Sequence, residues 1–296
     1  FAKSIVLARG NTLSESPTAF YQAHKNAEAM GRSISQLFLG VRIECAQCHH
    51  HPFEKWGQED YFAFAGFFSG VTKKKIPSGG WKIVSAGGKD LLHPRTKEPL
   101  AARALGAKPI EPTLGDRRVA LADWMIAKEN PFFARMIANR LWAHYFGRGL
   151  VEPIDDFKDG VDASNPELMA FLAKEIIHLK FDLKQFQRML YNTQTYQRDV
   201  SDDEVLAGEL YYFPGPVLRR MSAEQVWDSM LTMIVFDLDQ RKGIPSANRY
   251  GNAKELVDKD MKEILAMAKE RAKLRETQFK YQQATKDLQS KLRIAY

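Results

Sequence analysis

Two cysteines and the histidine that follows them are the residues best suited to carry chemistry in this 296-residue chain. Cys45 and Cys48 are its only cysteines, and His49 comes directly after the second one. Cys-x-x-Cys-His is the attachment signature of a c-type haem. Two thiols at this spacing can each bond a vinyl group of one porphyrin, and the histidine then supplies the proximal imidazole to the iron. The motif therefore predicts haem c on Cys45 and Cys48, with His49 as the proximal ligand.

Two other interpretations of the same residues remain open. Zinc also binds short Cys-x-x-Cys pairs, and Cys45, Cys48 and two of the neighbouring histidines would complete a tetrahedral site. A dithiol–disulfide redox pair is the third interpretation, but that motif normally follows a strand in a βαβ pattern, which this sequence lacks. Because a histidine directly follows the second cysteine and no other cysteine exists, we prefer haem.

The sixth ligand of such a haem iron has to come from elsewhere, because His50 and His51 are too close to His49 to reach the opposite face. The first candidate is His144, which falls within a predicted helix. The second is His93 in a turn region, followed by His24 or a methionine. Three cations are candidates for pairing with the haem propionates: Arg42, Lys55 and Arg140.

The bulk composition excludes several classes of protein. The net charge is +7, but lysine and arginine are spread along the chain, and no nucleic-acid-binding motif is present. No apolar run approaches the roughly 20 residues that a membrane-spanning helix needs. If haem holds both thiols, no disulfide can form. Covalent haem attachment is completed outside the cytoplasm, so we expect a protein of the periplasm or the cell surface.

Hydrophobic periodicity predicts a mainly α fold in four parts. Residues 1–75 form an irregular helical, haem-binding region, and 76–115 form a small β and loop excursion rich in glycine and proline. A helical domain follows at 116–235. Long charged helices are predicted over 236–296, and we expect this tail to continue beyond residue 296.

Within these parts several elements are predicted individually. The aromatic run 61–68 indicates a buried helix, and 81–85 indicates a strand. A helix ending at Gly147 is predicted to place Phe133, Ile137, Leu141 and Tyr145 in the core. Other helices should start at Pro166 after Ser-Asn, at the cap residue Asp182, and at a capping box over 222–225.

Further side chains have weaker interpretations. Phe53, Trp56 and Phe64 are candidates for the wall of a haem pocket, although ordinary core packing explains them almost as well. The carboxylates between 152 and 159 lack the spacing of a calcium loop, so we expect a solvated or arginine-paired segment.

Long strings of this sequence resemble a known pair of bacterial domains. Residues 45–61, CAQCHHHPFEKWGQEDY, resemble the signature of the planctomycete cytochrome-c-like domain of unknown function. Residues 116–135 and 139–153 (NRLWAHYFGRGLVEP) resemble its usual C-terminal companion, and 192–196 and 219–225 continue that match. The chain departs from the family at His50, where asparagine is common.

The resemblance implies an exported bacterial protein and an upstream cytochrome c domain, although no activity follows from it. Together with the motif it favours an extracytoplasmic c-type haem protein that passes electrons to a redox partner protein. One alternative is a haem enzyme that acts on peroxide, oxygen or an organic substrate. Another is a non-redox, surface- or polysaccharide-associated module whose Cys/His cluster holds zinc. The charged C-terminal helices further suggest a homo-oligomer.

Overall fold

The computed structural model describes residues 1–234, except Ser78, Pro112, Asp159, 161–162 and 202–208, together with short helical stretches between 259 and 285. The described part is mainly α-helical with little β structure, as predicted. Most of the predicted charged C-terminal helices lie outside the described residues. None of the helices in this part of the chain is long and apolar enough to cross a membrane.

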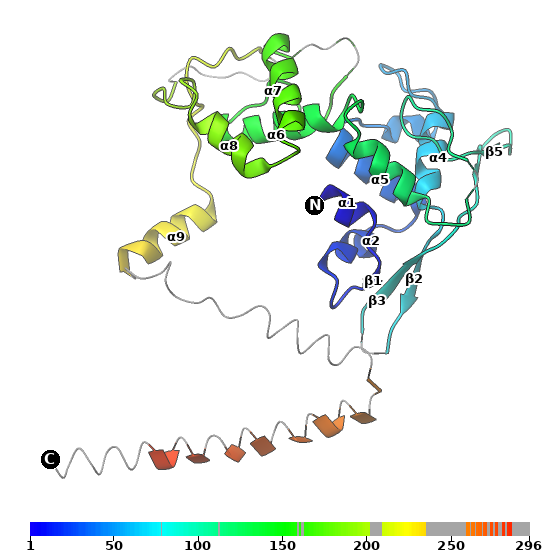
Figure 1. Cartoon of the computed structure of the whole chain (residues 1–296), viewed down its shortest axis with the longest axis vertical. Helices are drawn as coiled ribbons and strands as arrows, with labels where there is room; N and C mark the ends of the chain where they lie inside the picture. The colour runs from blue at the N-terminus through cyan, green and yellow to red at the C-terminus, as the bar shows by residue number, and fades with distance from the viewer. Residues whose placement is uncertain are drawn as a thin grey trace.

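Short helices build the region before and around the cysteine motif (Figure 1). They are α1 (Ala2–Val6), the 3₁₀ turn η1 (Ser16–Thr18), α2 (Ala19–Ala23), α3 (Ala27–Ile34), the π-helical turn η2 (Ser35–Leu39), the 3₁₀ turn η3 (Glu44–Gln47), α4 (Gln58–Ala65) and the 3₁₀ turn η4 (Gly66–Phe68). The predicted buried helix over 61–68 is confirmed, because α4 and η4 cover it and both Phe64 and Phe67 are buried. Asp60 starts α4 by accepting a hydrogen bond from the amide of Gly57 at 2.9 Å.

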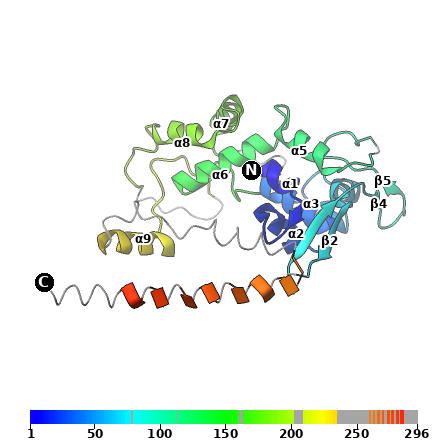
Figure 2. The same cartoon turned by 60° about the horizontal axis from the view of Figure 1, so that its bottom comes forward.

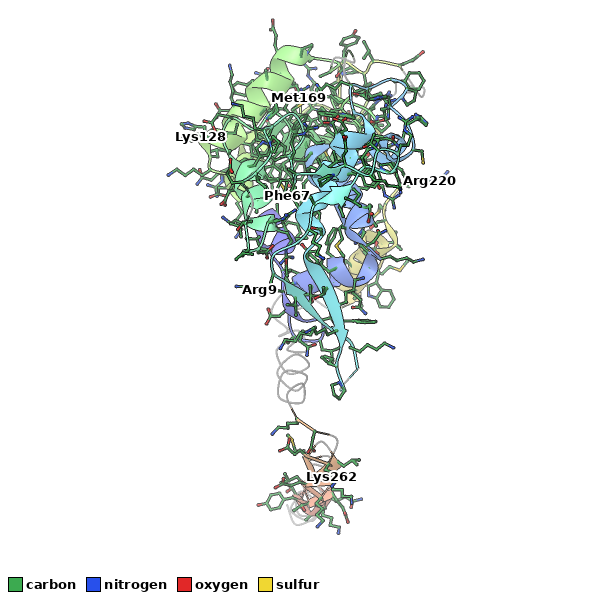
Figure 3. The ribbon with its side chains drawn as sticks, turned by 90° about the vertical axis from the view of Figure 1, so that its right-hand side faces the viewer. Arg9, Phe67, Lys128, Met169, Arg220 and Lys262 are labelled. Carbon is green, nitrogen blue, oxygen red and sulfur yellow. The ribbon has the colours of Figure 1, made fainter. Side chains whose placement is uncertain are left out.

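A small antiparallel sheet projects from this helical region (Figures 1 and 3). Strand β3 (Trp81–Ser85) was predicted and lies between β2 (Val71–Lys75) and β1 (Gly10–Asn11). Val71 pairs with Ser85, and Gly10 pairs with Ile83. A second pair of strands, β4 (Leu91–Leu92) and β5 (Pro99–Leu100), follows. Since β3 pairs with strands on both sides of it, residues before and after the boundary predicted at 76 share one sheet.

Longer helices form the second half of the described chain. They are α5 (Arg118–Ile126), α6 (Phe133–Phe146), α7 (Pro166–His178), α8 (Leu183–Tyr191) and α9 (Ala223–Ile234). The predicted starts are confirmed by their caps: Asn165 accepts from the Leu168 amide at 2.9 Å, and Asp182 from the Lys184 amide at 3.0 Å. Ser222 and Gln225 cap each other at the start of α9. Figure 2 shows α9 set apart from the other helices.

Helix α6 differs from the prediction in the face that it buries. Ala134, Ala138, Trp142 and Phe146 are buried, whereas Ile137, Leu141 and Tyr145 of the predicted stripe are only half-buried. The predicted stripe packs against the cores, but apart from Phe133 it is the less deeply buried of the two faces. Both series repeat every four residues, so periodicity alone could not choose between the two faces.

Two hydrophobic cores meet along α6. The first core joins α1, α3 and α4 to Leu121, Ala122 and Met125 of α5, and the second lies among α6, α7 and α8. Ile137 and Phe181 pack against both cores. Because α5 belongs to the first core, the packing does not break at residue 116, where the second helical domain was predicted to begin.

Polar contacts reinforce this junction. Arg42 forms an ion pair with Asp155, Gln36 donates to the same carboxylate at 2.8 Å, and the Phe157 amide donates to the Gly40 carbonyl at 2.7 Å. Burial of Asp155 opposes its ionisation, but the hydrogen bonds from Arg42 and Gln36 outweigh burial and lower its pKa. The interpretation of the acidic segment as arginine-paired is confirmed.

Candidate functional site

The two thiols lie on and directly after the 3₁₀ turn η3. Both cysteines are free and exposed, while Ala46 between them is fully buried and its amide donates to the Ile43 carbonyl at 3.1 Å. A 3₁₀ helix has three residues per turn, so positions i and i+3 eclipse one another. The buried Ala46 thus fixes a turn that presents Cys45 and Cys48 on one side, toward solvent.

His49 follows on the surface with one ring nitrogen already in use. Its Nδ1 contacts the backbone carbonyl oxygen of His50, and the imidazole is exposed. A histidine whose Nδ1–H donates to a carbonyl is held in the tautomer that leaves Nε2 as the metal-binding nitrogen. These features fit a proximal haem ligand.

Helix α4 and helix α3 hold the motif in place. Gln58 of α4 is buried and donates from Nε2 to the Gln47 carbonyl at 3.0 Å, so the backbone between the two cysteines is tied to the core. Arg32 of α3 forms an ion pair with Glu44, the residue before Cys45. Burial is the main reason that the pKa of Tyr61, also on α4, rises to about 12.

The aromatic residues after the motif lie in two different environments, buried and exposed. The His51 amide donates to the Trp56 carbonyl at 2.9 Å and closes the loop. Trp56 is buried against Phe132, with ring centroids 6.3 Å apart, and Phe64 is fully buried. Both are core residues, so they do not wall a pocket at the motif. Phe53 is 80% exposed and is the candidate of the three that remains available to cover a cofactor.

Of the other histidines proposed as distal ligands, His93 and His24 occupy structural positions, and His144 is exposed. His93 is buried, and its Nδ1 accepts hydrogen bonds from the amides of Arg95 and Thr96 at 3.3 and 3.1 Å. Both ring nitrogens of His24 contact protein atoms: the Phe20 carbonyl at 2.6 Å and the Ser33 hydroxyl at 2.7 Å. His144 is exposed on α6. It lies eleven residues, or about 16 Å along the helix axis, from Phe133, which is the first residue of α6.

Asn139, which lies near His144 on α6, has a structural role. Asn139 is fully buried, donates to the Val151 carbonyl at 2.9 Å and accepts from the Val151 amide at 3.0 Å. It thereby pins the segment after Gly147 against the helix. The role of Asn139 was not predicted from the sequence, where its only signal is an amide within an apolar face.

The proposed propionate partners lie in different environments. Arg42 pairs with Asp155, and Lys55 lies over the Trp56 ring at 5.0 Å. Arg140 is half-buried and lines a cavity that the cysteine motif does not border. Among the described residues, no group of three or more histidine, cysteine or acidic side chains is arranged to hold a metal ion. Cys45, Cys48 and the neighbouring histidines are thus not gathered into one cluster.

Two family models match the chain. The model described as PSD1, protein of unknown function (DUF1553), matches residues 117–293, more than half of the sequence. The chain belongs to the PSD1 family. The model described as PSCyt2, protein of unknown function (DUF1549), matches residues 6–73 and includes Cys45, Cys48 and His49. No curated protein and no solved structure matches.

These matches confirm the predicted pairing of two domains of unknown function. The PSD1 match begins at Arg117, directly before α5, and the PSCyt2 match ends within β2. Strand β3 and the strands after it lie between the two matched ranges. The PSD1 family carries no assigned activity, so function has to be argued from the residues themselves.

Proposed function

We propose that this protein is an extracytoplasmic c-type haem protein that transfers electrons. The observation that carries the proposal is the outward side of η3, where two free, exposed thiols stand three residues apart and precede an exposed histidine. Cys45 and Cys48 would hold the porphyrin through thioether bonds, and Nε2 of His49 would bind the iron. When bound, haem supplies reversible one-electron chemistry.

The residues of this chain would hold and orient the cofactor. Ala46 and Gln58 anchor the turn to the core, so the thiols keep their positions relative to one another. The carbonyl of His50 orients the His49 ring and increases the basicity of its free nitrogen. Phe53, exposed beside the motif, offers an apolar surface to the porphyrin.

Exposure favours electron transfer over chemistry at the iron. Oxygen- and peroxide-activating sites exclude water from the reacting centre, whereas both thiols and His49 lie at the surface. A cofactor attached there would be accessible to a redox partner protein. The protein would act in the periplasm or at the cell surface, where covalent haem attachment is completed.

The first experiment is a pyridine haemochrome spectrum of the exported chain, after acid–acetone extraction, from cells that assemble c-type cytochromes. We expect a c-type α-band that stays with the polypeptide. Replacing one thiol, in Cys45→Ser or Cys48→Ser, should shift that band, and replacing both should leave no retained haem. A wild-type chain that loses all haem on extraction would refute covalent attachment.

Histidine variants test the iron ligand. His49→Ala should abolish the low-spin spectrum, because the imidazole that directly follows the second thiol is removed. His178→Ala, an exposed histidine at the end of α7, is the matched control and should leave the spectrum unchanged. An unchanged Soret band in His49→Ala would remove His49 from the iron. A five-coordinate, high-spin wild type would favour the enzyme alternative over electron transfer.

A further inference from the structure

An apolar cavity of about 640 Å³ lies where the two hydrophobic cores meet. Its walls come from α1, the π-helical turn η2, the end of α5, α6, and the connection from α7 to α8. Figure 1 shows the first residues of the chain between the helices of the two halves, beside α6. Its volume falls within the roughly 300–1,000 Å³ of small-molecule sites, which often form at junctions between domains.

The inner walls of the cavity are hydrocarbon. Phe133 contacts Phe181 and Phe38, with ring centroids 5.2 and 6.4 Å apart, so three rings brace one another. The aliphatic part of the wall is formed by Leu37, Ile137 and Ile177. An occupant of this space must be apolar over most of its length.

The charged residues that line the cavity in the described part of the chain are positive. They are Lys3, Lys128, Arg140 and Lys180, and among the described residues no carboxylate joins them in the lining. Lys3 pairs with Asp123, whereas the other three form no ion pair within the described part of the chain. Nε of Arg140 is buried and has no hydrogen-bond partner among the described residues. Arg140 is thus a half-buried cation of the cavity lining, and a guanidinium binds an anion through charge-assisted hydrogen bonds.

The backbone beside the cavity is strained. Lys180 and Phe181 have φ angles of +52° and +59°, a region that residues with a side chain rarely adopt. These two consecutive left-handed residues bring a cation and an aromatic ring to the same cavity. Strain of this kind persists only where surrounding structure fixes it, and it is concentrated at binding sites.

We propose that this cavity binds an unbranched aliphatic carboxylate, the free acid of a medium-length hydrocarbon chain. The chain lies among the aromatic and aliphatic walls, and Arg140 binds the carboxylate with support from Lys128 and Lys180. A planar guanidinium suits a carboxylate through paired hydrogen bonds. The site is separate from Cys45 and Cys48, so binding does not depend on haem.

The test is calorimetric titration of the full 296-residue chain with octanoate, decanoate and dodecanoate below their micelle concentrations. Each added methylene should lower Kd about three- to fourfold until the cavity is filled. Dodecan-1-ol should bind at least about tenfold more weakly than dodecanoate, because it lacks the charge that Arg140 pairs with. Vesicles of an anionic phospholipid form the third arm, and tighter binding to vesicles than to dodecanoate would overturn the free-acid assignment.

Variants locate the binding site. Arg140→Ala should weaken dodecanoate binding at least about tenfold, and Ile137→Trp should remove binding by filling the cavity. Lys128→Ala changes an exposed side chain that folding does not require, and it should weaken binding by a smaller factor. Arg95→Ala removes an exposed cation outside the cavity and should bind as wild type does. Thermal unfolding confirms that each variant is folded. Equal affinity in Arg140→Ala and Arg95→Ala, or unchanged binding in Ile137→Trp, would overturn the proposal.

Discussion

Arg118 is a buried cation that links α5 to Asp116 and to the segment after α1. It is fully buried, binds Asp116 through Nε and Nη2 at 2.9 and 2.7 Å, and donates to the Ala8 carbonyl at 2.9 Å. Arg118→Ala leaves Asp116 without its counter-charge, so we expect a loss of about 3–5 kcal/mol in the free energy of unfolding. Urea titration measures it. The control is Lys3→Ala, whose exposed pair with Asp123 should contribute less than about 1 kcal/mol; equal losses would contradict the prediction.

The same pair predicts how stability depends on pH. Partial burial of Asp116 opposes ionisation, but hydrogen bonds and charge from Arg118 outweigh burial and lower its pKa. A carboxyl group whose pKa is lower in the folded than in the unfolded state stabilises the fold when the pH is above its unfolded pKa of about 3.9. This stabilisation is lost as the pH falls through the pKa of the folded state. The difference in unfolding free energy between wild type and Asp116→Asn should therefore be largest near pH 6 and shrink below about pH 4. A difference that stays constant from pH 6 to pH 2 would show that the charge of Asp116 contributes nothing.

For single residues, the sequence indicates which side chains could carry chemistry better than it indicates what surrounds them in the fold. Cys45, Cys48 and His49 were found because their spacing is local and the chemistry requires it. His93 stood out as a lone histidine, yet its ring accepts two backbone amides in a turn. Nothing in the sequence distinguished the buried Arg118 from the many exposed cations, because its burial depends on contacts with residues about 110 positions away.

Helices whose ends are set by neighbouring residues could be predicted from the sequence. Features that depend on contacts with distant parts of the chain could not. The starts of α7, α8 and α9 follow from cap residues that bond within three positions, and Gly147 ends α6 with a φ of +91°. The more deeply buried face of α6 was not predicted, because the two cores contact different sides of that helix. Strand β1 was missed because it has two residues and exists only through its pairing with β3.

Gly40 ends η2 at the junction between the cores, and we expect a side chain at this position to destabilise the fold. Its φ is +69°, and a Cβ there would lie 2.5 Å from Cδ2 of Phe157. Gly106 has a similar φ of +73° with open space around it. Gly106→Ala should cost about 1–2 kcal/mol for the left-handed backbone alone. Gly40→Ala should cost clearly more in urea unfolding, because the aromatic ring must also move; similar losses would show that the ring adapts freely.

At the scale of the whole molecule the two halves share more than a linker. Helix α5 lies within the range of the PSD1 match, but its apolar face belongs to the first core. Phe181, which follows α7, packs against both cores, and Arg42 reaches from the first half to Asp155 in the second. A sequence divided at residue 116 by composition cannot reveal this, because domain boundaries in sequence follow local signals and packing follows contacts.

We therefore expect the two cores to unfold together. Leu190 of α8 is fully buried in the second core, so Leu190→Ala should reduce stability there by about 2–5 kcal/mol. If the cores form one cooperative unit, the slowest-exchanging amides of α3 in the first core must lose the same protection as those of α7. Native-state hydrogen exchange at increasing urea, read by peptide mass, measures both helices. The control is Phe171→Ala, an exposed position on α7 that should change neither by more than about 0.5 kcal/mol. Loss of protection in α7 with unchanged protection in α3 would mean that the two cores unfold independently. In that case the shared aromatic contacts and the Arg42–Asp155 pair would hold the two domains together without coupling their stabilities.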